Sequence, residues 1–261
     1  MNDYLIRERQ DIILKRLKAS GRVLAAELAT EFAVSEDTIR RDLRAMAARG
    51  LCERVYGGAL SVTPGSGDLK ARTATIGDEK RALARLVAGE IAAGISVFLD
   101  AASTNIAVAQ ALPQGLDATV ITNSPAIAAA LDGRHDVSVI VIGGLIHRDV
   151  GGAIGARALE ELSEFHLDLC VLGACAVDIE AGLTCFHYED ALFKRKAAAR
   201  ARRVVAAMTA EKFSTRAPCA IVDLAMLDAL AVSDRLDAGA RQALAASGVR
   251  FLAARQGEVM P

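Results

Sequence analysis

Apolar side chains recur at helical spacing in three short stretches near the start of the chain. The repeated positions are Ile12, Ile13 and Leu17, then Leu28, Ala29 and Phe32, and finally Ile39, Leu43 and Met46. Ala33 and Val34 leave room for only a tight turn between the second and third stretches. Three short helices with a tight second turn predict a helix-turn-helix.

The third predicted helix has one apolar face and one face that carries guanidinium groups. Ser35 stands at its N-cap position, where a hydroxyl accepts a hydrogen bond from a free backbone amide. The outward face and its flanks carry Asp37, Thr38, Arg40, Arg41 and Arg44. Arginine binds both phosphate oxygens and the major-groove edge of guanine. A merely solvated helix face would also carry such charges, but the preceding helix, the turn and the cap together favour a helix that reads DNA.

A short β-wing is predicted directly after this helix. Residues 51–58 alternate in character and then turn on Gly57 and Gly58. Arg54 lies in this segment, where we expect it to contact the DNA backbone and so position the domain. The glycine pair lacks the lysine of a P-loop, so nucleotide hydrolysis is not indicated.

Two strings in this region resemble the DeoR family of bacterial transcriptional regulators. Residues 34–43 read VSEDTIRRDL, and residues 54–59 read RVYGGA. In that family the third helix enters the major groove. The resemblance therefore implies a DNA-binding role for Ser35, Thr38, Arg40, Arg41 and Arg44.

A change of composition after the wing predicts two domains. Residues 61–75 are polar, rich in Gly, Ser, Thr and Pro, and without periodicity, which is typical of a linker. We therefore expect a winged helix-turn-helix domain at 1–60, a linker at 61–75 and a larger domain at 76–261.

The larger region alternates between helical patterns and short runs of Val, Ile and Leu. Helices are expected at 78–92, 104–112, 125–131, 156–164, 188–202 and 237–246. Strands are expected at 95–99, 118–122, 137–142, 169–172, 204–208, 230–232 and 249–252. Nearly continuous apolar strands separated by helices predict a mostly parallel sheet covered on both faces, a Rossmann-like α/β fold.

Polar and glycine residues follow several of these strands, at the edge where a parallel α/β sheet binds its ligand. The candidate effector-binding residues are Asp100, Ala102, Ser103, Thr104, Thr122, Asn123, Ser124, Gly143, Gly144, Gly152, Glu189 and Lys194. Hydroxyl-rich helix starts and glycine loops offer free backbone amides to a phosphate, and Lys194 would add a positive charge. Each feature alone is as well explained by a helix cap or a surface lysine. Their joint placement at one sheet edge predicts an anion site.

The same half resembles the effector domain of the DeoR family at residues 100–104, 122–124, 143–144, 182–184 and 189–194. That domain is related in fold to ribose-phosphate isomerases and coenzyme A transferases, and the resemblance implies sugar phosphates or similar metabolites as ligands. The chain departs from the family at two places. Ala102 stands where the family has Gly, and residues 209–213 read TAEKF where it has Asp-x-Ser-Lys-Phe. Both changes are expected to narrow or alter the choice of effector.

Composition excludes several classes of protein. The formal net charge of −1 excludes a globally basic nucleic-acid binder, and aromatic residues at 4% with no Trp predict a core of Ala, Val, Leu and Ile. The five cysteines form no CxxC pair, so a disulfide framework or zinc site is not expected. His135, His147, His166 and His187 lack metal-ligand spacing and are expected to be incidental.

We expect a cytoplasmic protein with no cofactor, no metal and no membrane partner, since no signal peptide or apolar span is present.

Two functions remain open from the sequence. The first is a repressor of a carbohydrate or polyol catabolic operon, controlled by a phosphorylated sugar-like effector and binding double-stranded operator DNA as a homo-oligomer, dimer or tetramer. The second is a sugar-phosphate isomerase in which Asp100 or Glu189 is the general base and Lys194 the electrophile. An isomerase has no use for a winged helix with three outward arginines, so we expect the regulator and no enzyme.

Overall fold

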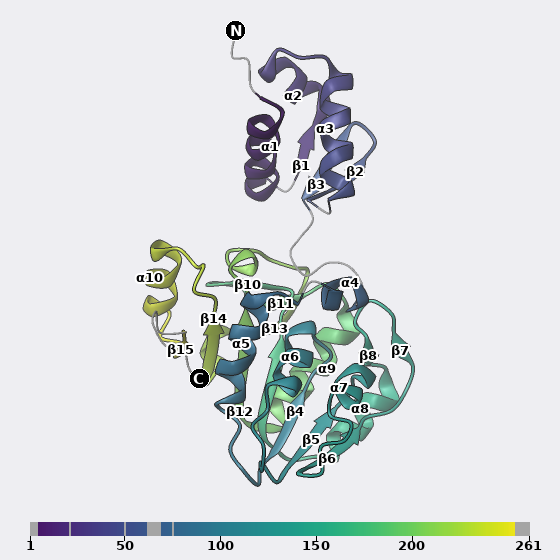
Figure 1. The fold of residues 1–261 in the computed structure, drawn as a ribbon, viewed down its shortest axis with the longest axis vertical. Helices are drawn as coiled ribbons and strands as arrows, with labels where there is room; N and C mark the ends of the chain where they lie inside the picture. Colours follow the sequence, from purple (N-terminus) through teal and green to yellow (C-terminus); the bar gives the residue numbers. More distant parts are fainter. Residues whose placement is uncertain (1–4, 21, 50, 62–68, 75, 254–261) are drawn as a thin grey trace. The chain divides into compact units, whose positions relative to one another are not determined.

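The computed structural model describes residues 5–20, 22–49, 51–61, 69–74 and 76–253 (Figure 1). The chain divides into two units, Met1–Thr63 and Pro64–Pro261. No helix in the described ranges is long and apolar enough to cross a membrane.

The first unit is a three-helix domain with a small antiparallel sheet. Its elements are α1 (Ile6–Ser20), β1 (Arg22–Leu24), α2 (Ala25–Phe32), α3 (Glu36–Ala48), β2 (Cys52–Val55) and β3 (Gly58–Ser61). The strand order is β1-β3-β2, and the hairpin β2–β3 forms the expected wing. Strand β1 was not predicted. The three predicted apolar stripes pack together, with Ile13, Leu28 and Ile39 among the fully buried side chains.

The turn between α2 and α3 depends on one residue in a left-handed conformation. Ala33 ends α2 at φ 53° and ψ 40°, and the next amide, of Val34, donates to the carbonyl of Ala29 at 3.0 Å. An L-residue with a β-carbon adopts this conformation at a cost of roughly 1–2 kcal/mol. The cost is offset because the turn lets Phe32 and Ile39 enter the same core.

A buried ion pair joins α1 to α3. Arg9 and Asp42 are 6% and 5% exposed, and Arg9 Nε donates to Asp42 Oδ2 at 2.6 Å. Gln10 Nε2 donates to the other carboxylate oxygen at 3.2 Å. The pair therefore fixes α3 against α1 on the side opposite to the exposed arginines of α3. The sequence pattern did not predict this contact.

The second unit is built on one seven-stranded sheet. Its elements are α4 (Leu69–Ala74), α5 (Asp78–Ala88), β4 (Ser96–Leu99), α6 (Ser103–Gln110), β5 (Ala118–Thr122), α7 (Pro125–Ala130), β6 (Val137–Val141), β7 (Ile146–His147), β8 (Gly152–Ala153), α8 (Ala156–Ser163), β9 (Leu167–Gly173), β10 (Ala176–Asp178), β11 (Gly182–Cys185), α9 (Tyr188–Ala199), β12 (Ala201–Met208), the 3₁₀ turns η1 (Ala210–Lys212) and η2 (Leu224–Met226), β13 (Cys219–Val222), β14 (Ala229–Val232), α10 (Ala238–Ala246) and β15 (Phe251–Leu252). The sheet order is β15-β14-β12-β9-β4-β5-β6, and every pairing in it is parallel.

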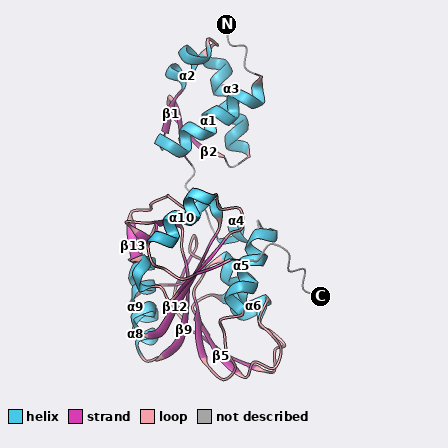
Figure 2. Cartoon of the chain, turned by 90° about the vertical axis from the view of Figure 1, so that its left-hand side faces the viewer, coloured by secondary structure: helices cyan, strands magenta, loops and turns pink. Residues whose placement is uncertain are grey.

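Helices cover both faces of this sheet, as predicted. In Figure 2, α8 and α9 lie on one face and α5 and α6 on the other. Side chains alternate between the two layers, so Phe98 packs with Phe193 of α9 while its neighbours Val97 and Leu99 pack with Leu83 of α5. Strands buried on both faces explain why the sequence showed unbroken apolar runs.

The structure corrects several predicted boundaries. Helix α4 lies within the segment predicted to be a linker without regular structure, and its Leu69 is buried in the second unit. Positions 62–68 and 75 of that segment lie outside the described residues. The helix predicted at 188–202 ends at Ala199, because β12 already begins at Ala201. The sheet β10-β11-β13 and the hairpin β7–β8 were not predicted.

Replacing Asp42 with Ala should loosen the first unit strongly. The change leaves Arg9 buried without its carboxylate, which typically costs about 3–5 kcal/mol. Hydrogen exchange of amides in α1 and α3 measures the loss within this unit alone. Glu31→Ala is the matched control, because it removes a partner of the exposed Arg16 and should cost less than about 1 kcal/mol. Equal effects of the two substitutions would contradict this role of the buried pair.

Candidate functional site

The start of α3 is fixed by its own side chains. Ser35 Oγ accepts a hydrogen bond from the amide of Thr38 at 3.2 Å and lies 2.9 Å from Thr38 Oγ1. Ser35 therefore acts as the predicted N-cap. Its direct contact with DNA stays a prediction.

The arginines of α3 point away from the core. Arg40 and Arg41 are exposed and pair with Glu36 and Asp37, one turn earlier, at 2.7 and 2.9 Å. Such exposed pairs contribute at most about 1 kcal/mol, so a phosphate or a base can replace the carboxylate at little cost. Arg44 is exposed on the same helix.

The wing carries the last of the predicted DNA-binding residues. Arg54 is exposed on β2, and Tyr56 at the hairpin turn is fully exposed. Gly58 is required at the start of β3, because a β-carbon there would lie 2.0 Å from the carbonyl oxygen of Val23. The glycine thus lets the wing pair closely with β1.

A pocket in the second unit lies where the strand order of the sheet reverses. The chain proceeds outward from β4 to β5 and β6, then returns to place β9 on the other side of β4. The loops that follow β4 and β9 diverge at this point, which is where open α/β sheets bind ligands. The lining residues are Arg72, Ala101, Ala102, Ser103, Thr104, Gly173, Ala174, Cys175, Lys194, Ala207 and Lys212.

The charge of this lining suits an anion. Arg72, Lys194 and Lys212 are cationic, and none of the lining residues within the described ranges is acidic. Lys212 Nζ donates to the carbonyl of Ala174 at 2.7 Å, and burial lowers the pKa of Lys212 to about 8. Lys80, just beyond the lining, donates to Ser103 Oγ at 3.2 Å.

Lys194 lies between two buried carboxylates behind the pocket. Its Nζ is 2.6 Å from Asp190 Oδ2 and 3.5 Å from Asp100 Oδ2. Burial lowers the pKa of Lys194, but the carboxylates of Asp190 and Asp100 raise it by more, so the amine is protonated. Burial also raises the pKa of Asp100 to about 6, against the opposing effect of Lys194. Lys194 is thus both a pocket cation and the counterion that keeps this buried cluster stable.

Asp100 is held in place from two further sides. Asp100 Oδ1 accepts hydrogen bonds from the amide of Gly173 at 2.9 Å and from Asn105 Nδ2 at 2.6 Å. The carboxylate therefore ties the end of β9 to the first turn of α6 and does not itself line the pocket.

Ala102 fits the position where the resemblance expects glycine. Its φ of −135° and ψ of 145° are open to any L-residue. The neighbouring position 173 is the one that needs glycine, because a β-carbon there would lie 2.3 Å from the β-carbon of Ala102. Four of the predicted effector residues line the pocket, namely Ala102, Ser103, Thr104 and Lys194.

The predicted residues at the end of β5 and directly after it bind the protein's own backbone and are not among the lining residues. Thr122 Oγ1 donates to the carbonyl of Leu99 at 2.7 Å, and Asn123 Nδ2 donates to the carbonyl of Ala153 at 2.9 Å. Ser124 Oγ donates to the carbonyl of Gly151 at 3.4 Å. All three side chains are buried and hold the loop after β4 and the strand β8 together.

The remaining predicted effector residues also lie outside the lining. Gly143 donates its amide to Glu161 Oε2 at 3.1 Å, and Gly144 is exposed beside it. A β-carbon at Gly152 would lie 2.5 Å from that of Ala101, so this glycine permits close packing. Glu189 is exposed, and its neighbour Asp190 holds Lys194.

The sequence analysis missed four charged residues of this region: Arg72, Lys80, Asp190 and Lys212. Arg72 was hidden in the predicted linker, and Lys80 is separated from Ser103 in sequence. The sequence could have predicted the contact of Asp190 with Lys194, because the two residues are four positions apart, or about one helical turn. Lys212 carries another, since it matches the lysine in the family string Asp-x-Ser-Lys-Phe.

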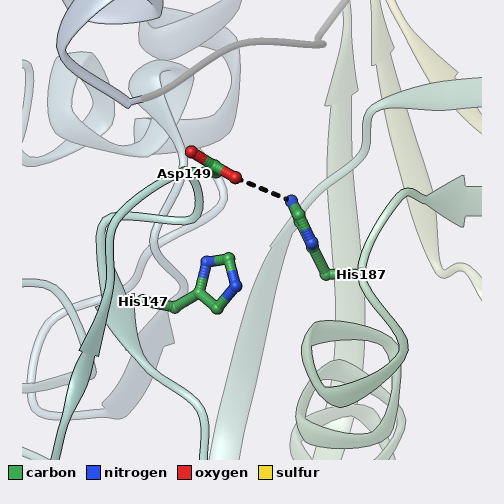
Figure 3. A group of neighbouring side chains, drawn as sticks. All are labelled: His147, Asp149 and His187. Atoms are coloured by element: carbon green, nitrogen blue, oxygen red, sulfur yellow. Dashed lines mark ion pairs between the residues drawn. The ribbon is translucent and has the colours of Figure 1, made fainter.

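The structure contradicts one expectation about the histidines. His147 and His187 were expected to be incidental residues without metal-ligand spacing, but their rings lie 4.5 Å apart, and His187 Nε2 is 3.7 Å from Asp149 Oδ2 (Figure 3). His135 and His166 are exposed and lie outside this group. The sequence could not show the cluster, because the turn after β7 and the loop before α9 approach each other only in the folded sheet.

Comparison with known proteins identifies both units. Residues 9–64 match the DeoR-like helix-turn-helix domain, and residues 76–235 match the DeoR C terminal sensor domain. The glycerol-3-phosphate regulon repressor of Escherichia coli K12 is 34% identical over 224 residues, which cover 85% of this chain and 89% of that protein. The transcriptional repressor GlcR of Bacillus subtilis is 32% identical over 254 residues, which cover 96% of this chain and 97% of that protein.

Solved structures give only a weak likeness. A ribose 5-phosphate isomerase A from Methanocaldococcus jannaschii has a TM-score of 0.38 and 15% identity, with 52% of this chain and 54% of that chain covered. The sequence matches, by contrast, span both units and include two named repressors. The chain therefore belongs to the DeoR family of DNA-binding transcriptional regulators, with a helix-turn-helix domain followed by a sensor domain.

Proposed function

We propose that this protein is a cytoplasmic repressor of carbohydrate or polyol catabolic genes whose DNA binding is controlled by a phosphorylated sugar-like effector. The observation that carries the proposal is the pocket at the reversal of the sheet. Its described lining holds no acidic residue and three cations, of which Lys194 is already paired with buried carboxylates. A family relative is named as the repressor of a glycerol-3-phosphate regulon, which supports a ligand of this chemistry. The free cysteines fit a reducing compartment.

The effector's phosphate would bind between the start of α6 and the side chains of Arg72 and Lys212. Ser103 and Thr104 begin an eight-residue helix whose first amides and dipole favour an anion. The carbon skeleton would then lie toward Ala102, Gly173 and Ala174, where Ala102 narrows the space.

Helix α4 offers a route from this pocket toward the DNA-binding unit. Arg72 lines the pocket and also donates to the carbonyl of Asp149 at 2.6 Å, while Leu69 of the same helix packs in the sensor core. Helix α4 lies closer in the chain to the DNA-binding unit than any other described element of the sensor unit. An effector that engages Arg72 would change how α4 is held, and so the freedom of the DNA-binding units. The response is limited by the effector's differential affinity for the two arrangements, typically worth about 1–3 kcal/mol.

The DNA-binding unit would act in a homo-oligomer. Two or more copies of α3 would read half-sites of operator DNA separated by whole helical turns. In this proposal α3 supplies base contacts through Arg40, Arg41 and Arg44, while Arg54 on the wing contacts the DNA backbone.

The proposal assigns no catalytic reaction to Asp100 or Glu189, because Asp100 is buried in structural hydrogen bonds and Glu189 is outside the pocket lining. Absence of turnover with pentose phosphates would fit this assignment, and measurable turnover would contradict it.

Arg44→Ala should weaken binding to the protein's own promoter by about 1–3 kcal/mol without changing effector binding. The reason is loss of a guanidinium contact in the major groove. Gel-shift titrations with the promoter fragment and with an unrelated fragment measure the loss of specific binding. Arg202→Ala is the matched control, since it removes an exposed arginine from the sensor unit. Unchanged DNA affinity in Arg44→Ala would rule out α3 as the reading helix.

Effector affinity should be highest between about pH 6 and 8. Below pH ~6 the phosphate gains a proton and loses charge. Above pH 8 Lys212 loses its proton, because burial lowers its pKa to about 8, so a dianion binds more weakly. Thermal-shift or calorimetric titration with the strongest ligand from a panel of sugar and polyol phosphates measures this profile.

Lys212→Arg is the informative variant for that profile. Its guanidinium stays charged, so the fall of affinity above pH 8 should disappear while binding below pH 8 is retained. Lys212→Met should weaken binding at every pH, and Lys70→Met, which removes an exposed lysine of α4, should not. A fall above pH 8 that persists in Lys212→Arg would show that another group titrates.

A further inference from the structure

Three side chains from two loops converge outside the effector pocket. His147 ends β7, Asp149 lies in the turn that leads to β8, and His187 directly precedes α9. One ligand atom from each lies within 4.8 Å of the others (Figure 3). The two histidine side chains and the carboxylate approach a common space from opposite sides, as Figure 3 shows.

Two imidazoles and one carboxylate are a donor set for first-row divalent metal ions. Zinc binds histidine nitrogen and carboxylate oxygen at about 2.0–2.2 Å, and three such ligands with water in the remaining position form a common open site. In a tetrahedral arrangement at that bond length the ligand atoms lie roughly 3.4 Å apart. Closing from 4.8 Å needs only small rotations of side chains, which His187 at 37% exposure and Asp149 at 52% are free to make.

Hydrogen bonds to the backbone carbonyls fix the positions of these three residues in their loops. The carbonyl of His147 accepts from the amide of Gly151 at 2.7 Å, and the carbonyl of His187 accepts from that of Ala191 at 3.0 Å. The carbonyl of Asp149 accepts from Arg72 Nη2 at 2.6 Å. Three fixed anchor points reduce the conformational entropy that an ion would otherwise have to remove.

The His147 ring is free to act as a ligand. Its Nδ1 accepts from the amide of Val150 at 3.5 Å, which is the outer limit of a hydrogen bond. So weak a contact does not fix one tautomer against a metal–nitrogen bond. The simple alternative, an ion pair of His187 with Asp149, leaves the tilted contact with the second imidazole, at a centroid distance of 4.5 Å, unexplained.

We propose that His147, Asp149 and His187 form a site for a first-row divalent transition metal, for which zinc is the best match, with water completing the coordination. A bound ion would fasten the β7–β8 hairpin to the start of α9. If the proposed function holds, this also bears on effector binding, because α9 carries Asp190 and Lys194, and the hairpin turn contacts Arg72.

Cobalt(II) is the probe that tests the site directly. The full chain is treated with EDTA, freed of chelator and titrated with Co²⁺ in the presence of a reductant, while visible absorption is recorded. We expect one Co²⁺ per chain, with ligand-field bands of a four- or five-coordinate N/O site, and displacement by Zn²⁺. His187→Gln and Asp149→Asn should each weaken binding at least about tenfold. His166→Gln and His135→Gln, which remove exposed histidines elsewhere, should bind as the wild type does.

The same titration contains the results that would overturn the proposal. An intense near-ultraviolet thiolate band would place the ion on Cys175 or Cys219, which are half-buried. Absence of stoichiometric binding at micromolar Co²⁺ and Zn²⁺, or equal affinity in Asp149→Asn and wild type, would also refute the site. Circular dichroism of each metal-free variant verifies its fold. Because the readout is metal binding, failure here leaves the effector proposal standing, and loss of effector binding leaves the metal titration unchanged.

Discussion

Lys194 is a buried cation held between Asp190 and Asp100 at the point where β4 and β9 diverge. Removal of one member from such a cluster leaves an uncompensated charge in the interior and typically costs about 3–5 kcal/mol. The cluster brings together elements that are far apart in the chain, since Asp100 follows β4 and binds the end of β9 while Asp190 and Lys194 lie on α9. The cluster thereby ties the ends of β4 and β9 to α9 beside the pocket.

Two tasks fall to different cations of the pocket: Lys194 compensates the buried carboxylates, and other cations are left to attract an anion. Lys194 is already neutralised by carboxylates, so its net attraction for a phosphate is small. None of the lining residues in the described ranges is acidic, and Lys212 and Arg72 are the lining cations that the proposed function assigns to the phosphate. Burial lowers the pKa of Lys212 to about 8, so a nearby anion can shift its protonation. In the proposed function, a bound dianion would favour the protonated amine, so the pocket would prefer phosphorylated over neutral ligands.

Much of the architecture follows from the sequence, because apolar periodicity is a local property. The three stripes of the first unit and the strands of the sheet are read from residues a few positions apart. Ser103, Thr104 and Lys194 were predicted in the pocket by the rule that ligands bind beyond strand ends. The same rule failed for Thr122, Asn123 and Ser124, since β5 lies one strand away from the reversal and its polar residues bind backbone groups instead. Arg72, Arg9–Asp42 and the pair His147–His187 depend on contacts between distant segments, which periodicity does not encode.

The central claim is that the pocket and the operator are energetically coupled. Fluorescence anisotropy of a labelled fragment of the protein's own promoter measures operator affinity with and without a saturating sugar or polyol phosphate. The reciprocal titration measures affinity for that phosphate with and without the fragment. The account predicts that both affinities change by the same factor, roughly 5- to 150-fold. A phosphate that binds the pocket tightly and leaves operator affinity unchanged would contradict it.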